Sequence, residues 1–352
     1  MVDEKTVATI FLLRKGKAMQ CFRLNNAIWF IGFFVFAAFQ INGDCFGAPI
    51  DANVNGLERA FTFVSISEGQ RVLSNEDAFV TQLSVFDRQV RLQSETDLGT
   101  TQLLKFSADQ VCAWTTEEKE VVTLAISRLE PKLRELKITW DEPIKIIKTT
   151  GREESDAAYT RGRAIVFPES KIGNLERPPT RLFAHELFHV ISRSNPELRD
   201  RLFQLIGFQR VPLIRLPRHL EDMRITNPDA PKMEHVIRLS LDANEKVFAT
   251  PFLFSKEAYT PAKKSLFAYL QFQLMQVIED SNGEWMPVVS DQKARFISPD
   301  HPDYWRQIRG NTRYVIHPEE IMADNFSFLL TGEKPKDSLL LDEIKREFQQ
   351  QE

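Results

Sequence analysis

The segment Ala184–Val190 contains two histidines and a glutamate in a spacing that can bind and use a metal ion. Residues four apart on an α-helix stand on the same face, so His185 and His189 can hold one ion together. Glu186 lies about 100° further round the helix, where its carboxylate could take a proton from a metal-bound water without ligating the metal. The chain has only 6 histidines in 352 residues, so random pairs at this spacing are rare. The pattern therefore indicates a metal site with an acid–base group beside it.

The residues around this segment predict a buried helix, because most of them are large and uncharged. Pro178-Pro179 precede the apolar run and Asn195-Pro196 follow it, which brackets a helix of ordinary length. An alternative interpretation is a core helix whose two histidines are satisfied by hydrogen bonds alone, since an imidazole without partners is costly to bury.

A catalytic zinc site needs a third protein ligand and keeps one position open for water. Residues 314–326 offer a candidate for that ligand. His317-Pro318 predicts a helix start, with proline at the first helical position. Glu320 and Asp324 then stand four apart on one face of this helix. An exposed acidic helix face is the alternative interpretation of this pair.

Together, the two motifs resemble those of the gluzincin metallopeptidases, His-Glu-x-x-His followed by Glu-x-x-x-Asp on a second helix. The resemblance implies that Zn²⁺ is bound by His185, His189 and Glu320. It also implies that Asp324 accepts the outer N–H of a zinc histidine, most simply His185, and so fixes its tautomer.

Glu319 is the rival third ligand, but Ala323 stands four residues after it and cannot play the second role. The stretch from His189 to Glu320 is longer than in the best-known members of the family, so an insertion or a subdomain must lie between the two helices. Ser192 and Asn195 stand where the metzincin version would have its Gly and third His, which excludes that version.

The implied fold class is α+β: a zincin-like, two-lobed metallopeptidase, mostly helical, with a small mixed sheet in the N-terminal lobe. In that lobe we expect a helix over 116–136 capped by Thr115 or Thr116, strands over 136–147 and 162–167, and then the His185 helix. Residues 163–167 would form the edge strand that pairs with an extended peptide.

The expected organisation has five parts. They are a signal peptide or N-terminal anchor at 1–48, an N-terminal extension at 49–115, the zincin N-terminal lobe at 116–206, a helical C-terminal lobe at 207–335, and a C-terminal helix or tail at 336–352. The extension contains short helices, including one over 77–92, and could pack on the catalytic lobe or act as an inhibitory pro-segment. Residues 265–278 are apolar on nearly every side, which predicts a core segment or a buried strand.

The implied mechanism assigns Glu186 as the general base, which would pass the proton on to the departing amine. A further donor should stabilise the oxyanion. Tyr314 and His317 are the first candidates because they adjoin the Glu320 helix, although His317 could simply cap that helix. Tyr304 and His301 are the other candidates.

The N-terminus predicts export. Residues 27–38 are an apolar run of 12 preceded by basic residues, which fits a signal peptide and is short for a membrane span. Met19 would give a more typical signal peptide than Met1. We therefore expect an exported protein, periplasmic, secreted or attached to the envelope, with membrane contact only through an uncleaved N-terminal anchor.

Charge and composition bear on the partners. A net charge of −4 and a pI near 6.0 provide no electrostatic footprint for nucleic acid, so the expected partner is a peptide or protein substrate. No Gly-x-Met-Glu-Asn motif of the exopeptidase type is present, which favours an endopeptidase. Two other interpretations stay open: an exported protein with a structural zinc, and a metal-free envelope or interaction protein.

Overall fold

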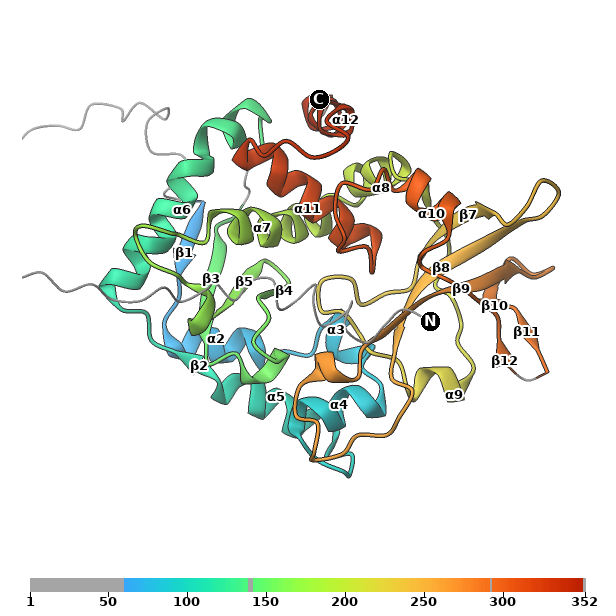
Figure 1. Ribbon diagram of the computed structural model, residues 1–352. Helices are drawn as coiled ribbons and strands as arrows, with labels where there is room; N and C mark the ends of the chain where they lie inside the picture. The colour runs from blue at the N-terminus through green and yellow to red at the C-terminus, as the bar shows by residue number, and fades with distance from the viewer. Residues whose placement is uncertain (1–59, 139–141, 292, 351–352) are drawn as a thin grey trace, which may run out of the picture. The chain divides into compact units, whose positions relative to one another are not determined.

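The computed structural model describes residues 60–138, 142–291 and 293–350 (Figure 1). Within these ranges no helix is both long and apolar enough to cross a membrane. The predicted signal peptide or anchor at 1–48, with Met19 and the apolar run 27–38, lies outside the described residues.

The first half of the described chain builds a mixed five-stranded sheet. Its strands are β1 (Phe61–Phe63), β2 (Val111–Cys112), β3 (Ile144–Thr149), β4 (Tyr159–Arg161) and β5 (Ala164–Pro168). Their order is β1-β3-β5-β4, and β2 pairs with the C-terminal end of β3. Strands β1, β3 and β5 are parallel, and β4 is antiparallel to β5. The apolar run of β3 is buried on both faces, as expected of a central parallel strand.

The order of this sheet corrects one prediction. Residues 163–167 were expected to form the edge strand, but β5 lies between β3 and β4. The edge on this side of the sheet is instead β4, which folds back on β5 through the turn at Gly162, where φ is +55°. A two-residue turn of this kind needs a left-handed backbone, which glycine adopts without strain.

The helix between β2 and β3 is confirmed, and the strand after it is shorter than predicted. Helix α6 spans Thr116–Glu135, and Thr115 caps it in a capping box with Glu118. The strand predicted over 136–147 begins only at Ile144, because Leu136 still closes the helix.

Residues 60–115 are part of the same fold rather than a separate extension, because β1 pairs with β3. Their helices are α2 (Ile66–Leu73), α3 (Ala78–Thr81), α4 (Val85–Leu92) and α5 (Gly99–Asp109). The single helix predicted over 77–92 is two helices. Ser84 interrupts it, because its side chain accepts the Asp87 N–H and starts α4 with a capping box.

Helices α7 (Thr180–Ser194) and α11 (Pro318–Thr331) pack against each other, and α7 also contacts α6, β4 and β5 (Figure 1). Both helices begin where their proline signals predicted. Two further helices, α8 (Pro196–Gln204) and α12 (Leu339–Gln349), contact α11. The C-terminal helix is confirmed, with Asp337 accepting the Leu339 and Leu340 N–H groups at its start.

The expectation of a helical C-terminal lobe is wrong, because the regular structure of residues 208–297 is mostly strand. An antiparallel six-stranded sheet has the order β10-β9-β8-β7-β6, with β13 also paired to β9. Its strands are β6 (Phe208–Arg210), β7 (His235–Ser240), β8 (Lys246–Phe254), β9 (Gln271–Glu279), β10 (Trp285–Pro287) and β13 (Phe296–Ile297). β9 confirms that residues 265–278 contain a strand, which is buried at Leu274, Met275 and Val277.

The reason lies in the residue types. β8 and β9 together contain four phenylalanines, two valines and one isoleucine, residue types that favour strands. Cross-strand packing gathers their apolar side chains into one cluster. The remaining elements of the described chain are short. They are β11 (Val289–Ser290), β12 (Lys293–Ala294), α9 (Arg218–Glu221), α10 (Pro302–Gln307), η1 (Arg152–Glu154), η2 (Glu169–Lys171) and η3 (Leu266–Ala268).

Candidate metal centre

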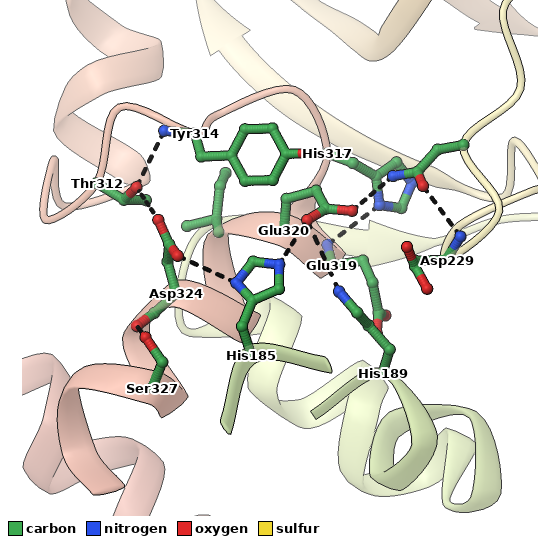
Figure 2. A network of polar contacts seen from close by, with 12 residues as sticks. His185, His189, Asp229, Thr312, Tyr314, His317, Glu319, Glu320, Asp324 and Ser327 are labelled. Carbon is green, nitrogen blue, oxygen red and sulfur yellow. Dashed lines mark hydrogen bonds and ion pairs between the residues drawn. The ribbon is translucent and has the colours of Figure 1, made fainter. Parts of the chain in front are cut away.

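Helices α7 and α11 bring the three predicted zinc ligands together in the interior. Glu320 Oε2 lies 3.0 Å from His185 Nε2 and 3.7 Å from His189 Nε2 (Figure 2). His189 and Glu320 are only 1% and 2% exposed, and His185 is 8% exposed. One face of α7 therefore supplies two imidazole nitrogens that face a single carboxylate oxygen of α11.

The geometry and donor set of this cluster fit a zinc ion. With Zn–N and Zn–O distances near 2.1 Å and tetrahedral angles, ligand atoms lie about 3.4 Å apart. The two nitrogen–oxygen distances, 3.0 and 3.7 Å, lie on either side of that value. In addition, His189 Nε2 is buried and has no hydrogen-bond partner among the described residues. A buried nitrogen of this kind normally has a partner, and a metal ion would provide one.

The outer nitrogen of His185 is held as the resemblance implied. His185 Nδ1 lies 3.1 Å from Asp324 Oδ1, so its N–H donates to the carboxylate, and Nε2 is the nitrogen that would ligate a metal once its own proton is displaced. Thr312 Oγ1 donates to the other oxygen of Asp324, at 2.5 Å. Burial opposes the charged form of His185, but Asp324 and Glu320 outweigh it and raise the pKa of His185 well above its usual value.

Glu319 takes a role that the sequence did not predict. Its Oε1 lies 3.0 Å from His189 Nδ1 and also accepts a hydrogen bond from the Ser192 hydroxyl. Glu319 therefore orients His189 as Asp324 orients His185, instead of competing with Glu320 as a ligand. Adjacent acids on a helix point about 100° apart, which could have suggested this division of roles.

Two residues of the loop between α9 and β7 complete the surroundings. Asn227 Nδ2 donates to Glu320 Oε1 at 2.6 Å. A carboxylate oxygen of Asp229 forms, with Glu186 and His189, a second group whose potential ligand atoms lie within 4.8 Å of one another. Neither residue belongs to a local motif, so only the folded chain reveals them.

The surroundings shift the pKa values of Glu320 and Glu186 in opposite directions. Burial would raise the pKa of Glu320, but the charge of His189 and the hydrogen bond from His185 lower it to about 2. Burial, and then the charge of Asp229, raise the pKa of Glu186 to about 8. Glu186 is 3% exposed, and its Oε2 has no hydrogen-bond partner among the described residues. This carboxyl group is next to the candidate ligands without being one of the three.

The structure separates the four candidate oxyanion donors. The Tyr314 ring lies 6.0 Å from the His185 ring, centroid to centroid, beside the cluster (Figure 2). Burial and then the charge of Glu320 raise the pKa of Tyr314 well above its usual value, so its phenol keeps the proton that a donor needs. His317 Nδ1 accepts the Glu319 N–H at 3.1 Å, which makes His317 the cap of α11.

The other two candidates have local roles. The Tyr304 hydroxyl is buried and donates to the Val315 carbonyl at 2.7 Å. His301 caps α10 by accepting the Asp303 N–H. Of the four residues, Tyr314 is therefore the one placed beside the cluster with a protonated donor.

A family model matches a segment of the chain that contains part of this site. Residues 149–197 match the model of the eCIS core domain, the core domain of extracellular contractile injection systems. The matched segment runs from the end of β3 through β4, β5 and α7, so it includes His185, Glu186 and His189 but not Glu320. No curated protein matches the chain, and no solved structure matches it. The match associates the chain with an extracellular system, in agreement with the coarse prediction of export.

Proposed function

We propose that this protein is an exported zinc-dependent peptidase. The observation that carries the proposal is that His185 Nε2 and His189 Nε2 both face Glu320 Oε2, while each Nδ1 is held by a separate carboxylate. Imidazole and carboxylate ligands suit Zn²⁺, and three protein ligands leave one position for water. When bound, zinc would act as a Lewis acid and lower the pKa of a coordinated water towards about 7.

The residues of the chain supply the acid–base steps. Glu186 accepts a proton from the attacking water at its carboxylate and delivers it to the departing amine nitrogen. Burial raises the pKa of Glu186 in the metal-free protein, and a bound zinc ion would favour the ionised carboxylate that takes the proton. Tyr314 donates a hydrogen bond to the oxyanion that develops on the scissile carbonyl.

The substrate we propose is an extended peptide, cut internally. Strand β4 is an edge of the mixed sheet and contacts α7, so a peptide that pairs with β4 would run alongside the zinc helix.

The match over 149–197 supports a second, coarser proposal: the protein is a secreted or structural component of a contractile injection system. The two proposals are compatible, because a component of such a system can be an enzyme.

The test compares zinc content and peptide hydrolysis in three forms of the protein. We expect one zinc per chain in the wild type and in Glu186→Gln, and little or none in Glu320→Ala. We expect hydrolysis of a peptide library by the wild type alone. If the wild type contains zinc but Glu186→Gln does not change peptide hydrolysis, the zinc is structural. No zinc in any form, after refolding with the metal present, would overturn the proposal.

A further inference from the structure

Residues 222–230, which we call the strap, cross the candidate metal centre between α9 and β7. Two of their side chains reach it. Asn227 donates to the Glu320 oxygen that does not face the histidines, at 2.6 Å. Asp229 lies beside Glu186 and His189, and its side chain is only 7% exposed. The strap therefore covers the side of the centre where the Glu186 carboxylate lies.

Asp229 also occupies the free edge of the sheet. Its Oδ1 accepts the backbone N–H of Thr160 at 2.8 Å and the Thr160 hydroxyl at 2.5 Å. Thr160 is the middle residue of the edge strand β4, and its N–H points away from β5. A peptide that added to this edge would place a backbone carbonyl oxygen on the same N–H. The Asp229 carboxylate takes the position of that carbonyl.

The strap is anchored by a buried network of charges on α4. The two carboxylate oxygens of Asp87 accept the Thr226 N–H, each at 3.1 Å, and Arg91 donates to the Thr226 carbonyl at 3.1 Å. Arg91 is itself paired with Asp87 at 2.6 Å and with Glu154 at 2.7 Å. The Ser84 hydroxyl donates to the Arg224 carbonyl at 2.6 Å. Buried, fully paired groups of this kind hold the strap in a defined position.

A small cavity lies between the strap and β8, and none of the three candidate ligands lines it. This cavity, lined by strap residues, by β8 and by His317, has a volume of about 30 Å³. This volume holds one or two water molecules. The three candidate ligands and Glu186 are each 8% exposed or less, and Asp229 holds the Thr160 N–H. A peptide can therefore pair with β4 beside the centre only after Asp229 has moved.

We propose that the strap is an autoinhibitory segment, in which Asp229 imitates the backbone carbonyl of a bound peptide and Asn227 ties the strap to Glu320. The inference rests on the proposed function, because it assigns the regulation of the same site. The substrate competes with the strap for the Thr160 N–H, and the apparent affinity for a peptide is lowered by the fraction of molecules in which the strap is closed.

The experiment measures peptide binding separately from hydrolysis. A peptide hydroxamate is titrated calorimetrically into zinc-loaded wild type, Asp229→Ala and Asn227→Ala. Asp300→Ala is the matched control, because Asp300 is exposed and far along the chain from the strap. We expect Asp229→Ala to bind the hydroxamate about tenfold more tightly, Asn227→Ala to show a smaller gain, and the control to match the wild type. Hydrogen exchange at the Thr160 amide should also become faster in Asp229→Ala.

The outcomes separate this inference from the proposed function. Tighter binding in Asp229→Ala without peptide hydrolysis by any form would support the autoinhibitory role of the strap and overturn the proposed peptidase function. The autoinhibitory role of the strap would be overturned if both strap variants bound the hydroxamate equally or more weakly than the wild type. This outcome counts only if both variants retain zinc and thermal melting shows that they are folded. Faster hydrolysis by Asp229→Ala than by the wild type would support both.

Discussion

At the candidate metal centre, two neighbouring acids of α11 have different roles because they point in different directions. Glu320 faces the inner nitrogens of both histidines, and Glu319 holds the outer nitrogen of His189. A carboxylate on the outer nitrogen fixes the tautomer, keeps the ring in place and makes the inner nitrogen a better ligand. The affinity for the metal therefore depends on residues that do not touch it.

The first prediction concerns this outer contact. Replacing Glu319 by Ala removes the acceptor of the His189 N–H, so we expect zinc affinity to fall by about 10- to 100-fold. Competition with a chelator of known affinity measures the change. Asp324→Ala should have a loss of similar size through His185. An unchanged affinity in Glu319→Ala would show that the Glu319 contact does not support metal binding by His189.

The second prediction concerns pH. Burial would lower the pKa of His189, but the charges of Asp229 and Glu320 raise it to about 9 in the metal-free protein. A protonated nitrogen cannot ligate, so the metal must displace protons from the histidines below that pH. We expect zinc affinity to rise with pH by about tenfold per unit for each proton displaced, between pH 6 and 8. Chelator competition at several pH values tests this, and a flat profile would contradict it.

At the scale of elements, α4 links the N-terminal segment to the strap. Arg91 is 4% exposed and lies between the carboxylates of Asp87 and Glu154, on α4 and η1. A buried arginine between two acids contributes little net stability by itself, but its removal leaves two buried charges without a partner. The helices of residues 60–115 thereby position the loop that covers the centre.

The third prediction follows from this network. We expect Arg91→Met to lower the free energy of unfolding by about 3–5 kcal/mol, because Asp87 and Glu154 stay buried. The matched control is Arg88→Met on the same helix, whose partner Asp97 is 30% exposed, with an expected cost below about 1 kcal/mol. Urea unfolding measures both. Equal losses of unfolding free energy in the two variants would show that the buried network contributes no more to stability than the exposed pair.

At the scale of the whole molecule, one buried acid outside the candidate centre should shape stability against pH. Burial raises the pKa of Glu153 to about 7, its Oε2 has no hydrogen-bond partner among the described residues, and it is 2% exposed. The folded protein therefore retains a proton that the unfolded chain loses near pH 4.5. Since the folded state binds more protons, its stability falls as pH rises from about 4.5 to 7.

The fourth prediction uses this difference. Glu153→Gln removes the ionisation, so the variant and the wild type should be equally stable near pH 4. At pH 8 the variant should be more stable by about 3 kcal/mol, because each unit of pKa shift corresponds to about 1.4 kcal/mol. Urea unfolding at the two pH values measures the change. A difference that does not vary with pH would contradict the assignment.

Local periodicity determined much of the candidate site before any fold was known. The spacing of His185, Glu186 and His189 and the pair Glu320 and Asp324 depend only on the helical period of 3.6 residues. The flanking prolines and the cap at His317 placed the two helices correctly. These features are contained within a few residues of each other, so the sequence alone could reveal them.

The tertiary structure decided everything that depends on distant segments. It made β4 rather than β5 the edge of the sheet, because strand order is a property of pairing and not of residue type. It turned the predicted helical lobe into an antiparallel sheet, since apolar runs such as those of β8 and β9 fit either period until cross-strand packing selects one. It also brought Asn227 and Asp229 to a centre built from α7 and α11. The sequence by itself determined which side chains can bind a metal, and the folded chain decided which residues orient them and what covers them, because those contacts join segments that no local pattern connects.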